Sequence, residues 1–404
     1  MKIPSIDEID IKDKRVLIRA DLDVPLTDKG EVGDDSKITR ILPTLQYAIG
    51  QKAKVILASH LGKPGGRFNK QYSLEPVGRC LSRILDSRIY FPENSVGNAV
   101  KKVVSDMHPG EVVLLENLDF HKQEGSNGGE YAKRLSETAD VYVNEAFSVS
   151  GQKRSSLVAV TEYIDTVSVG IDFKRELEGL ERLRAPDRPF VVIAGGSRVA
   201  HKMGLMEALL RKADTFLVGG AVGNTFLKAL GKETGASLID DSCIYRAKKL
   251  ISGAAIREIG LVTPVDAVSV KEKLRNGGDS YIIPAGRVPG GSKVLDIGPK
   301  TRKEFAGKIN GAETVLLCGP LGVCEVPEFS KGTGETAMAL AQASAFTAAM
   351  GTRTVSTLDA LGIKEKKEGD AEGMDFISRG GDASVEYIVT GTLPAVYAIR
   401  ERIK

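Results

Sequence analysis

The sequence predicts an α/β fold made of two Rossmann-like lobes, each built on a doubly wound parallel sheet. Short runs of apolar, β-branched residues recur without polar alternation, which is typical of strands buried on both faces of a parallel sheet. Helical patterns lie between these runs, and that order is the order of βαβ units. The chain also has 404 residues, more than one hydrophobic core usually serves. We therefore expect two α/β halves.

Expected strands and helices follow one another along both halves. In the first half, the runs that predict strands are Val16–Ile18, Val55–Leu57, Val112–Leu115, Val141–Val143 and Val167–Val169. In the second half, they are Phe190–Ala194, Thr215–Val218, Leu261–Val265, Val315–Leu317 and Thr352–Val355. Helical patterns cover Glu130–Thr138, Met203–Lys212, Arg246–Ile259, Arg302–Ile309 and Glu335–Met350.

The stretch Lys174–Arg188 is the best candidate for a linker between the halves. It begins as a charged helix, KRELEGLERLR, and ends in APDRP. Prolines beside charges stop a helix, and a new strand is expected at Phe190. The final residues, LPAVYAIRERIK, have an amphipathic pattern and could pack on either half.

Charge and cysteine content exclude several classes of protein. Lys plus Arg total 56 and Asp plus Glu total 53, whereas a general nucleic-acid binder needs a strong basic excess. The four cysteines show neither CxxC spacing nor a nearby histidine for zinc, so we expect reduced thiols. The N-terminus lacks an apolar signal region, and no apolar run reaches the ~18 residues of a membrane helix. We expect a cytoplasmic protein with no nucleic-acid or membrane partner.

Two motifs follow strands of the first half, at the strand ends where open parallel sheets bind ligands. Asp21 and Asp23 could accept hydrogen bonds from substrate hydroxyls, or they could shape a turn before Pro25. The next strand is followed by SHLGKPGGR, which starts at Ser59. Its glycines and cations could cradle an anion. The alternative for this loop is a flexible surface segment.

Glycine-rich turns in the second half predict a nucleotide site. The sequence AGGSRVAHK, which starts at Ala194, combines glycines, cations and a helix start, as a phosphate site requires. It is neither a Walker A loop nor a GxGxxG fingerprint. Similar turns are GGAVGNT from Gly219, CGPLGV from Cys318, KGT from Lys331 and RGGD from Arg379. Each turn is weak alone, but together they indicate nucleotide binding.

These motifs resemble the phosphoglycerate kinase family. The matching segments are RVLIRADLDVPL, SHLGKPGG, LLENLDFH, VYVNEAFSVS, FVVIAGGSRVAHKMG, LVGGAVGNTFLKALG, LDIGPKT, CGPLGVCEVPEFSKGT and SRGGDAS. They follow in the family's order from about residue 14 to residue 395. The resemblance therefore covers nearly the whole chain.

The resemblance implies two lobes joined by a hinge helix, each with its own ligand. The N-terminal lobe, residues 1–172 with residues 390–404 returning to it, would bind 3-phosphoglycerate or 1,3-bisphosphoglycerate. The C-terminal lobe, residues 173–389, would bind ATP or ADP with Mg²⁺. The reaction passes a phosphoryl group between the acyl phosphate and ADP, a step of glycolysis and gluconeogenesis. It needs positioning and charge neutralisation rather than a protein nucleophile. The family is usually monomeric, so we expect a monomer.

The resemblance also implies roles for individual residues. Lys202 matches the lysine that steadies the transferring phosphoryl group, and Lys37 and Arg40 are further catalytic candidates. The implied substrate-binding positions are Asp21, Asp23, Lys37, His60, Leu61, Gly62, Lys63, Asp119, Gln152 and Arg154. The implied nucleotide-binding positions are Gly195, Gly196, Arg198, Lys202, Gly219, Gly220, Gly319, Pro320, Glu325 and Asp359. Among these, Glu325 matches the acid that holds the ribose, and Asp359 is the candidate for Mg²⁺.

The anion-binding positions of the first half depart from the family's pattern. Where the family has arginine, this chain has Lys37, Lys63, Asp119 and Gln152. Lysine keeps the charge but loses bidentate geometry, whereas aspartate inverts the charge and glutamine removes it. Two lost hydrogen bonds to charged groups would weaken substrate binding by on the order of 10²–10⁴. Compensation would have to come from the arginines Arg40, Arg67 and Arg154.

The second half departs as well, which leaves three hypotheses open. Arg198, His201 and Cys318 replace a lysine, an acid and an asparagine, and the family's GGGD[ST] loop aligns with Ser356–Ala360, which lacks the glycines. The first hypothesis is an active phosphoglycerate kinase with a divergent site. The second is a weakened or inactive relative that binds a nucleotide or another phosphorylated small acid. The third, a nicotinamide-dependent dehydrogenase, is disfavoured because no GxGxxG follows a strand.

Overall fold

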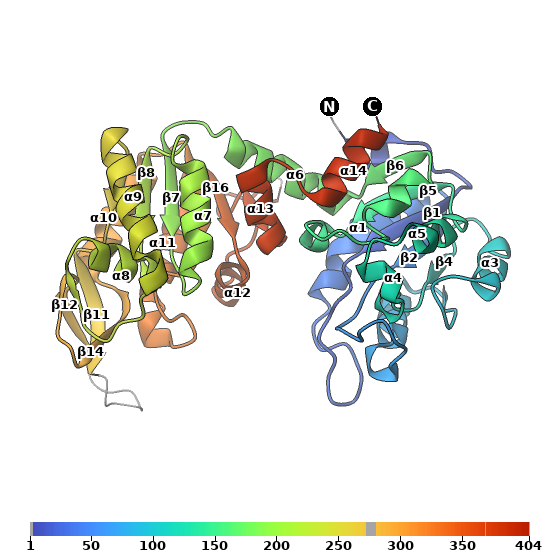
Figure 1. Cartoon of the computed structure of the whole chain (residues 1–404), viewed down its shortest axis with the longest axis horizontal. Coiled ribbons are helices and arrows are strands. Elements are labelled where there is room, and N and C mark those ends of the chain that lie inside the picture. The colour runs from blue at the N-terminus through green and yellow to red at the C-terminus, as the bar shows by residue number, and fades with distance from the viewer. Residues whose placement is uncertain (1–2, 272–279, 368, 404) are drawn as a thin grey trace. The chain divides into compact units, whose positions relative to one another are not determined.

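The computed structural model describes residues 3–271, 280–367 and 369–403. The chain forms two compact units, one of Met1–Glu178 with Thr392–Lys404 and one of Gly179–Gly391 (Figure 1). The boundary falls within helix α6 (Ile171–Arg184), whereas the sequence placed it just after residue 172. Each unit has its own parallel sheet and its own hydrophobic core.

The first unit is built on a six-stranded parallel sheet in the order β3-β4-β2-β1-β5-β6. In chain order, its strands are β1 (Arg15–Ala20), β2 (Lys54–Ala58), β3 (Ile89–Tyr90), β4 (Val112–Leu114), β5 (Val141–Glu145) and β6 (Thr166–Val169). The helices packed in this unit are α1 (Ser36–Gly50), α2 (Glu75–Leu85), α3 (Asn98–Ser105), α4 (Lys122–Gly125), α5 (Gly129–Ser136), the start of α6 and α14 (Pro394–Arg402). Short 3-10 helices are η1 (Ile6–Glu8), η2 (Lys70–Tyr72), η3 (Leu118–Phe120), η4 (Phe147–Val149) and η5 (Ala159–Glu162).

The second unit has a six-stranded parallel sheet in the order β10-β8-β7-β15-β16-β17. Its strands are β7 (Phe190–Ala194), β8 (Thr215–Val218), β10 (Gly260–Val262), β15 (Thr314–Cys318), β16 (Phe346–Met350) and β17 (Phe376–Ser378). Its helices are α7 (Val199–Leu209), α8 (Gly220–Ala229), α9 (Ile244–Ile256), α10 (Pro299–Asn310), α11 (Lys331–Ala341), α12 (Thr352–Ala360) and α13 (Asp382–Thr390), with 3-10 helices η6 (Asp241–Cys243) and η7 (Pro327–Phe329).

The predicted α/β class with parallel sheets is confirmed. Central strands are buried on both faces: Val16, Leu17 and Ile18 of β1 are fully buried, as are Leu316 and Leu317 of β15. This burial explains why the strands appear in the sequence as continuous apolar runs rather than alternating ones.

A second, smaller set of strands was not predicted. In the second unit β11 (Asp266–Lys271), β12 (Tyr281–Pro284) and β14 (Ser292–Ile297) form an antiparallel sheet. Two short strands, β9 (Glu233–Thr234) and β13 (Arg287–Val288), pair in parallel. Polar residues interrupt β11 (DAVSVK) and β14 (SKVLDI), whereas β12 (YIIP) is apolar but only four residues long.

Two expected elements of the second unit are wrong. The helix expected over Glu335–Met350 ends at Ala341, and the strand expected over Thr352–Val355 is the start of α12. The alanine-rich sequence TAMALAQASAFTAAM favours a helix by propensity, but pairing with β15 and β17 makes residues 346–350 a buried strand. Gly351 then adopts φ +98°, where β-carbon sterics are unfavourable, and turns the chain into α12.

The strand order places two pairs of loops where ligands bind. In the first sheet the order reverses beside β1, which pairs with β2 on one side and β5 on the other. In the second sheet it reverses beside β7, which pairs with β8 and β15. Ligands of open α/β sheets bind at the carboxyl ends of strands around such a reversal. The loops after β1, β5, β7 and β15 therefore define where each unit's site should be sought.

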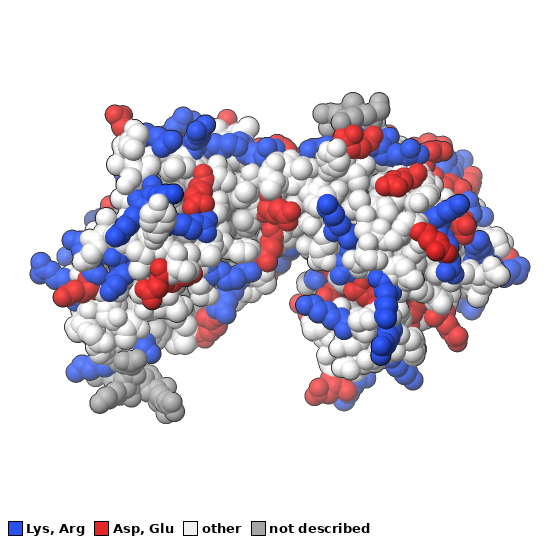
Figure 2. All heavy atoms as spheres, viewed as in Figure 1, with Lys and Arg blue, Asp and Glu red and all other residues white. Residues whose placement is uncertain are grey.

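The surface charge is mixed. Figure 2 shows Lys and Arg side chains interspersed with Asp and Glu on the face in view. Within the described part of the chain, no helix has both the length and the apolar character needed to cross a membrane.

Candidate functional site

In the first unit, Asp21 is the first residue after β1 and carries a fixed negative charge. Lys37 Nζ donates to both carboxylate oxygens of Asp21 at 3.0 Å, and the Ser148 hydroxyl donates to Oδ2. Burial raises the pKa of Asp21, but the Lys37 ammonium, the nearby His60 and the hydrogen bonds from Ser148 and Lys37 together outweigh burial, and the pKa falls to about 2. Asp23 instead accepts a hydrogen bond from the Gly62 amide at 2.8 Å, which fixes the turn after β2.

His60 lies over a buried arginine that sequence reasoning missed. Arg19, in β1, is fully buried, and its Nη2 lies 3.2 Å from His60 Nδ1. Guanidinium groups only donate, so Nδ1 accepts and Nε2 keeps the imidazole proton. Burial, reinforced by the charge of Arg19, lowers the pKa of His60 to about 3. His60 is therefore a neutral hydrogen-bond donor. The signal for Arg19 was a charged residue within the apolar run VLIRA.

A pocket of about 340 Å³, called the basic pocket below, contains three predicted substrate-binding residues, Lys63, Asp119 and Arg154. Its other lining residues are Gly65, Gly66, His121, Lys122 and Gly125. The charge inversion at Asp119 is neutralised there, because Arg154 Nη1 forms an ion pair with the Asp119 carboxylate. Arg154 Nε also donates to Gln152 Oε1 at 2.7 Å. Arg154 is thus at the substituted positions, but its guanidinium already has protein partners. Lys122, a lining residue, was not singled out from the sequence.

Arg40 does not reach this region. Its Nη2 lies 2.5 Å from Asp172 Oδ2 and 3.2 Å from Glu176 Oε1, both in α6. The guanidinium of Arg40 therefore joins α1 to α6, and a catalytic role for Arg40 stays a prediction. Leu61 is buried, and its carbonyl accepts from Asn117 Nδ2 at 2.8 Å, so its contribution is to the loop's shape.

In the second unit, the glycine turns after β7 and β15 pack backbone against backbone. A Cβ atom at Gly195 would lie 2.3 Å from the Pro320 carbonyl oxygen, and one at Gly319 would lie 2.2 Å from the Gly195 carbonyl oxygen. The Gly196 amide donates to the Pro320 carbonyl at 2.6 Å. Only glycine permits this approach, which brings the two turns together at the strand-order reversal.

Two neighbouring pockets open beside these turns. The first, about 340 Å³, is largely apolar, and its lining includes Gly220, Ala221, Leu238, Val294, Leu321, Val323 and Glu325. The second, about 300 Å³, is lined by Gly195, Gly196, Ser197, Arg198, Lys202, Gly319, Pro320, Gly351, Thr352, Arg353 and Thr354. Gly196, Ser197, Pro320 and Arg353 line both pockets. Below, these are the apolar pocket and the cationic pocket. Gly219, the remaining predicted residue, packs its backbone against Leu321 beside them.

Lys202 is the buried cation of the second unit. Its side chain projects from α7 into the cationic pocket and is 7% exposed. A Cβ atom at Gly351 would lie 4.0 Å from Lys202 Nζ. Among the described residues, no acceptor forms a hydrogen bond or ion pair with that ammonium group. A buried, unpaired charge is costly, so Lys202 is suited to an anionic ligand.

Two further cations at the cationic pocket have acidic partners. Arg198 Nη1 lies 3.0 Å from Asp382 Oδ1, which also lies 3.7 Å from His201 Nδ1. Arg353 Nη1 lies 2.7 Å from Glu325 Oε1, and both side chains are about two-thirds exposed. Arg353 was not singled out from the sequence. It stands where β16 ends and α12 begins, and the misassigned strand over residues 352–355 hid that strand end.

Asp359 is not brought to either pocket, and the expectation of a metal ligand there is corrected. It lies in the last turn of α12, where its Oδ1 is 2.9 Å from Arg379 Nη2. The loop that does reach the pocket is Gly351–Thr354, since β16 ends at Met350. Within the described ranges, no three His, Cys, Asp or Glu side chains gather as a metal site would need.

Comparisons with known proteins all indicate one family. A family model described as phosphoglycerate kinase matches residues 6–391. A phosphoglycerate kinase of Pelotomaculum thermopropionicum is 41% identical over 399 residues, covering 98% of this chain and 99% of that protein. One of Clostridium botulinum is 38% identical, with 98% of both chains covered. Among solved structures, phosphoglycerate kinase from Coxiella burnetii is similar at a TM-score of 0.89 with 34% identity, covering 100% of both chains. That from Pyrococcus horikoshii has a TM-score of 0.81 and 26% identity over 99% of both.

Proposed function

This chain belongs to the phosphoglycerate kinase family, and on that premise we propose that it transfers a phosphoryl group reversibly between 1,3-bisphosphoglycerate and ADP. The products in that direction are 3-phosphoglycerate and ATP, so the chain acts as a phosphotransferase with a carboxyl group as acceptor. We assign the triose to the first unit and the nucleotide to the second. That the protein works as a cytoplasmic monomer stays a prediction.

The unpartnered ammonium group of Lys202 is the observation that supports this function most strongly. It lies at the meeting point of two glycine turns, where main-chain amides and a fixed cation can face a phosphate. Charge that develops on a transferring phosphoryl group is stabilised by such preorganised donors. The apolar pocket next to it suits the flat, weakly polar face of a base.

In the first unit, we assign substrate contacts to groups with fixed protonation. Asp21 stays ionised and can accept a hydrogen bond from a substrate hydroxyl, while Lys37 holds its orientation. His60, neutral and held through Nδ1, can donate from Nε2. Lys63 and Arg154 supply positive charge in the basic pocket. None of these residues needs to change its protonation state for the phosphoryl group to move.

The family uses nucleotides generally with Mg²⁺, yet the protein groups at the cationic pocket do not fit a protein-held metal. Its lining side chains are cationic or neutral, and Asp359 lies elsewhere. The role that we assign to Lys202, Arg198 and the glycine amides is charge neutralisation at the nucleotide phosphates.

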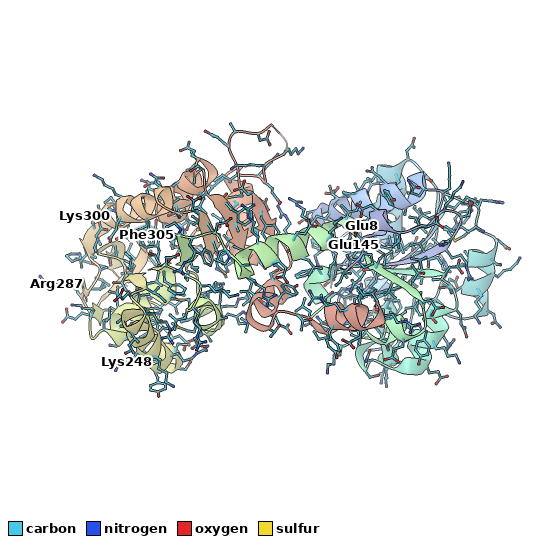
Figure 3. The ribbon with its side chains drawn as sticks, turned by 90° about the horizontal axis from the view of Figure 1, so that it is seen from above. Glu8, Glu145, Lys248, Arg287, Lys300 and Phe305 are labelled. Carbon is cyan, nitrogen blue, oxygen red and sulfur yellow. The ribbon has the colours of Figure 1, made fainter. Side chains whose placement is uncertain are left out.

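The test is a coupled assay with 3-phosphoglycerate and MgATP. We expect Lys202→Ala to lower kcat by on the order of 10²–10³, because one preorganised donor is lost at the developing charge. Lys248→Ala is the matched control, since Lys248 is an exposed lysine on α9 of the same unit (Figure 3). Equal rates for both variants would remove Lys202 from the mechanism.

A second candidate function has its own support. The Asp119–Arg154 ion pair and the neutral Gln152 leave the basic pocket with less free positive charge than arginines would give. A weakened homologue that binds a nucleotide or another phosphorylated acid is therefore the alternative. Background turnover by well-folded protein, not improved by Asp119→Arg with Gln152→Arg, would favour this alternative over an active kinase.

A further inference from the structure

The cationic pocket has no carboxylate in its lining. Lys202, Arg198 and Arg353 contribute three cationic side chains, and the other lining residues are glycine, proline, serine or threonine. The acids nearest in the hydrogen-bond network, Asp382 and Glu325, each pair with one of the arginines rather than with each other. A phosphate chain entering this pocket meets three cationic side chains. Among the described residues, no group of three His, Cys, Asp or Glu side chains gathers that could hold a metal ion beside it.

Arg353 is held at this position by the backbone. It is the second residue of α12, two residues after Gly351, whose φ of +98° turns the chain into the helix. Thr354, its neighbour, accepts a hydrogen bond from the Gly319 amide through Oγ1 at 2.8 Å. That bond joins the start of α12 to the glycine turn after β15. The guanidinium therefore emerges where the apolar and cationic pockets meet, which is where the phosphates of a bound nucleotide would begin.

The present partner of Arg353 can be exchanged. Its ion pair with Glu325 is solvent-exposed on both sides, and such pairs contribute little to stability. A phosphate can replace the carboxylate in a bidentate contact of the same kind. Release of Glu325 would leave its carboxylate free to accept hydrogen bonds from ribose hydroxyls in the adjoining pocket. Replacement of Glu325 by a phosphate as the partner of Arg353 would therefore free Arg353 to bind the phosphates and Glu325 to bind the ribose.

We propose that Arg353 takes the place of a divalent metal in nucleotide recognition, so that the second unit binds metal-free ADP or ATP at least as tightly as the Mg²⁺ complex. A metal-free diphosphate carries more negative charge than its Mg²⁺ complex and is attracted more strongly by three cations. An added Mg²⁺ ion would be repelled by the same cations. This inference rests on the proposed function, since it assumes that the second unit binds a nucleotide.

Calorimetry on the full-length protein tests the proposal, with ADP as the titrant in EDTA and again in excess MgCl₂. We expect the wild-type Kd in EDTA to be equal to or lower than that in Mg²⁺. Arg353→Ala should raise the Kd in EDTA by roughly tenfold or more, because one charge-assisted contact is lost, whereas Arg353→Lys should retain most of the affinity. Arg353→Asp should make binding depend on Mg²⁺. Arg287→Ala, an exposed arginine on β13 (Figure 3), is the control and should leave the Kd unchanged.

The possible outcomes distinguish a failure of this inference from a failure of the proposed nucleotide-binding function. Wild-type binding that is at least tenfold tighter with Mg²⁺, or an Arg353→Ala Kd in EDTA equal to that of wild type, would overturn the role of Arg353 and leave the kinase assignment standing. An absence of ADP binding under both conditions, with a normal far-UV circular dichroism spectrum, would overturn the nucleotide assignment itself and this inference with it.

Discussion

At the scale of single residues, the first unit's site depends on how its charges are already paired. Asp119 and Arg154 are both less than one-fifth exposed and form an ion pair, so an anionic ligand of Arg154 would have to compete with the Asp119 carboxylate for the guanidinium. Arg154 is nevertheless the one arginine that the structure brings to the basic pocket. Substitution of Asp119 should therefore show how far its ion pair with Arg154 weakens anion binding in the basic pocket.

Asp119→Asn should tighten binding of 3-phosphoglycerate by about tenfold, since a hydrogen bond to a charged group is worth roughly 1.5–3 kcal/mol and the amide competes weakly for Arg154. Isothermal calorimetry measures the change. Asp140→Asn is the control, because Asp140 pairs with Arg15 at the opposite, amino end of β1. Weaker binding in Asp119→Asn would mean that the carboxylate orients Arg154 rather than competing for it.

Residue identities at strand ends could be predicted from the sequence, but their partners could not. Asp21 and Lys202 were predicted because they directly follow or closely adjoin apolar strands, and the structure places them at the strand-order reversals. The pairing of Asp119 with Arg154 joins residues 35 positions apart, and no local pattern encodes it. Arg353 was missed for a different reason, because the preceding strand was assigned as helix.

At the scale of elements, helix α6 starts on a buried carboxylate. Glu145 accepts hydrogen bonds from the amides of Asp172 at 3.2 Å and Phe173 at 2.9 Å, and the Thr44 hydroxyl also donates to it. Burial, with repulsion from Asp172, raises the pKa of Glu145 to about 7 despite these bonds. Glu145 is labelled in Figure 3. The start of this helix therefore depends on a group that titrates near neutrality.

We expect Glu145 to make the protein less stable as pH rises from about 4.5 to about 7. In that window the unfolded chain has lost the proton and the folded chain still binds it, so unfolding releases a proton and is favoured by higher pH. Glu145→Gln cannot titrate and should lack this part of the decline in unfolding free energy, measured by urea denaturation at pH 5, 6, 7 and 8.

Glu130→Gln is the control, since Glu130 is an exposed glutamate on α5. It should retain the wild-type pH profile. If Glu145→Gln also keeps the full wild-type slope between pH 5 and 7, Glu145 is ionised throughout that range and the assigned pKa is wrong.

The strands of the central sheets could be predicted from the sequence, because a strand that is buried on both faces consists of a continuous apolar run. Residues 190–194 and 215–218 have the same limits in the sequence prediction and in the structure. The prediction for residues 346–350 was wrong because alanine is compatible with both helix and strand, and pairing with β15 makes this segment a strand. The antiparallel strands β11 and β14 were not predicted because polar and apolar residues are mixed along them, and the prediction also did not include the short apolar strand β12.

At the scale of the whole molecule, the end of the chain returns to the unit in which it began. Helix α14 packs against η5 and β6 of the first unit, and the Ala395 amide donates to the Ser150 carbonyl at 3.1 Å. Its inward residues Val396 and Ile399 are fully buried, while Tyr397 is exposed. The sequence left open which half this helix would join, because an amphipathic pattern fixes a buried face but not its partner.

Ile399→Ala should therefore destabilise the first unit by about 2–5 kcal/mol, the usual cost of the lost burial and the cavity that remains. Urea unfolding followed by far-UV circular dichroism measures it, since the chain has no tryptophan for fluorescence. Tyr397→Ala on the same helix is the control and should change stability by less than about 1 kcal/mol. ADP affinity, which we assign to the second unit, should be unchanged under native conditions in both variants. A loss of stability from Tyr397→Ala that equals the loss from Ile399→Ala would mean that α14 is held by its outer face instead, and that the buried face contributes little to the first unit.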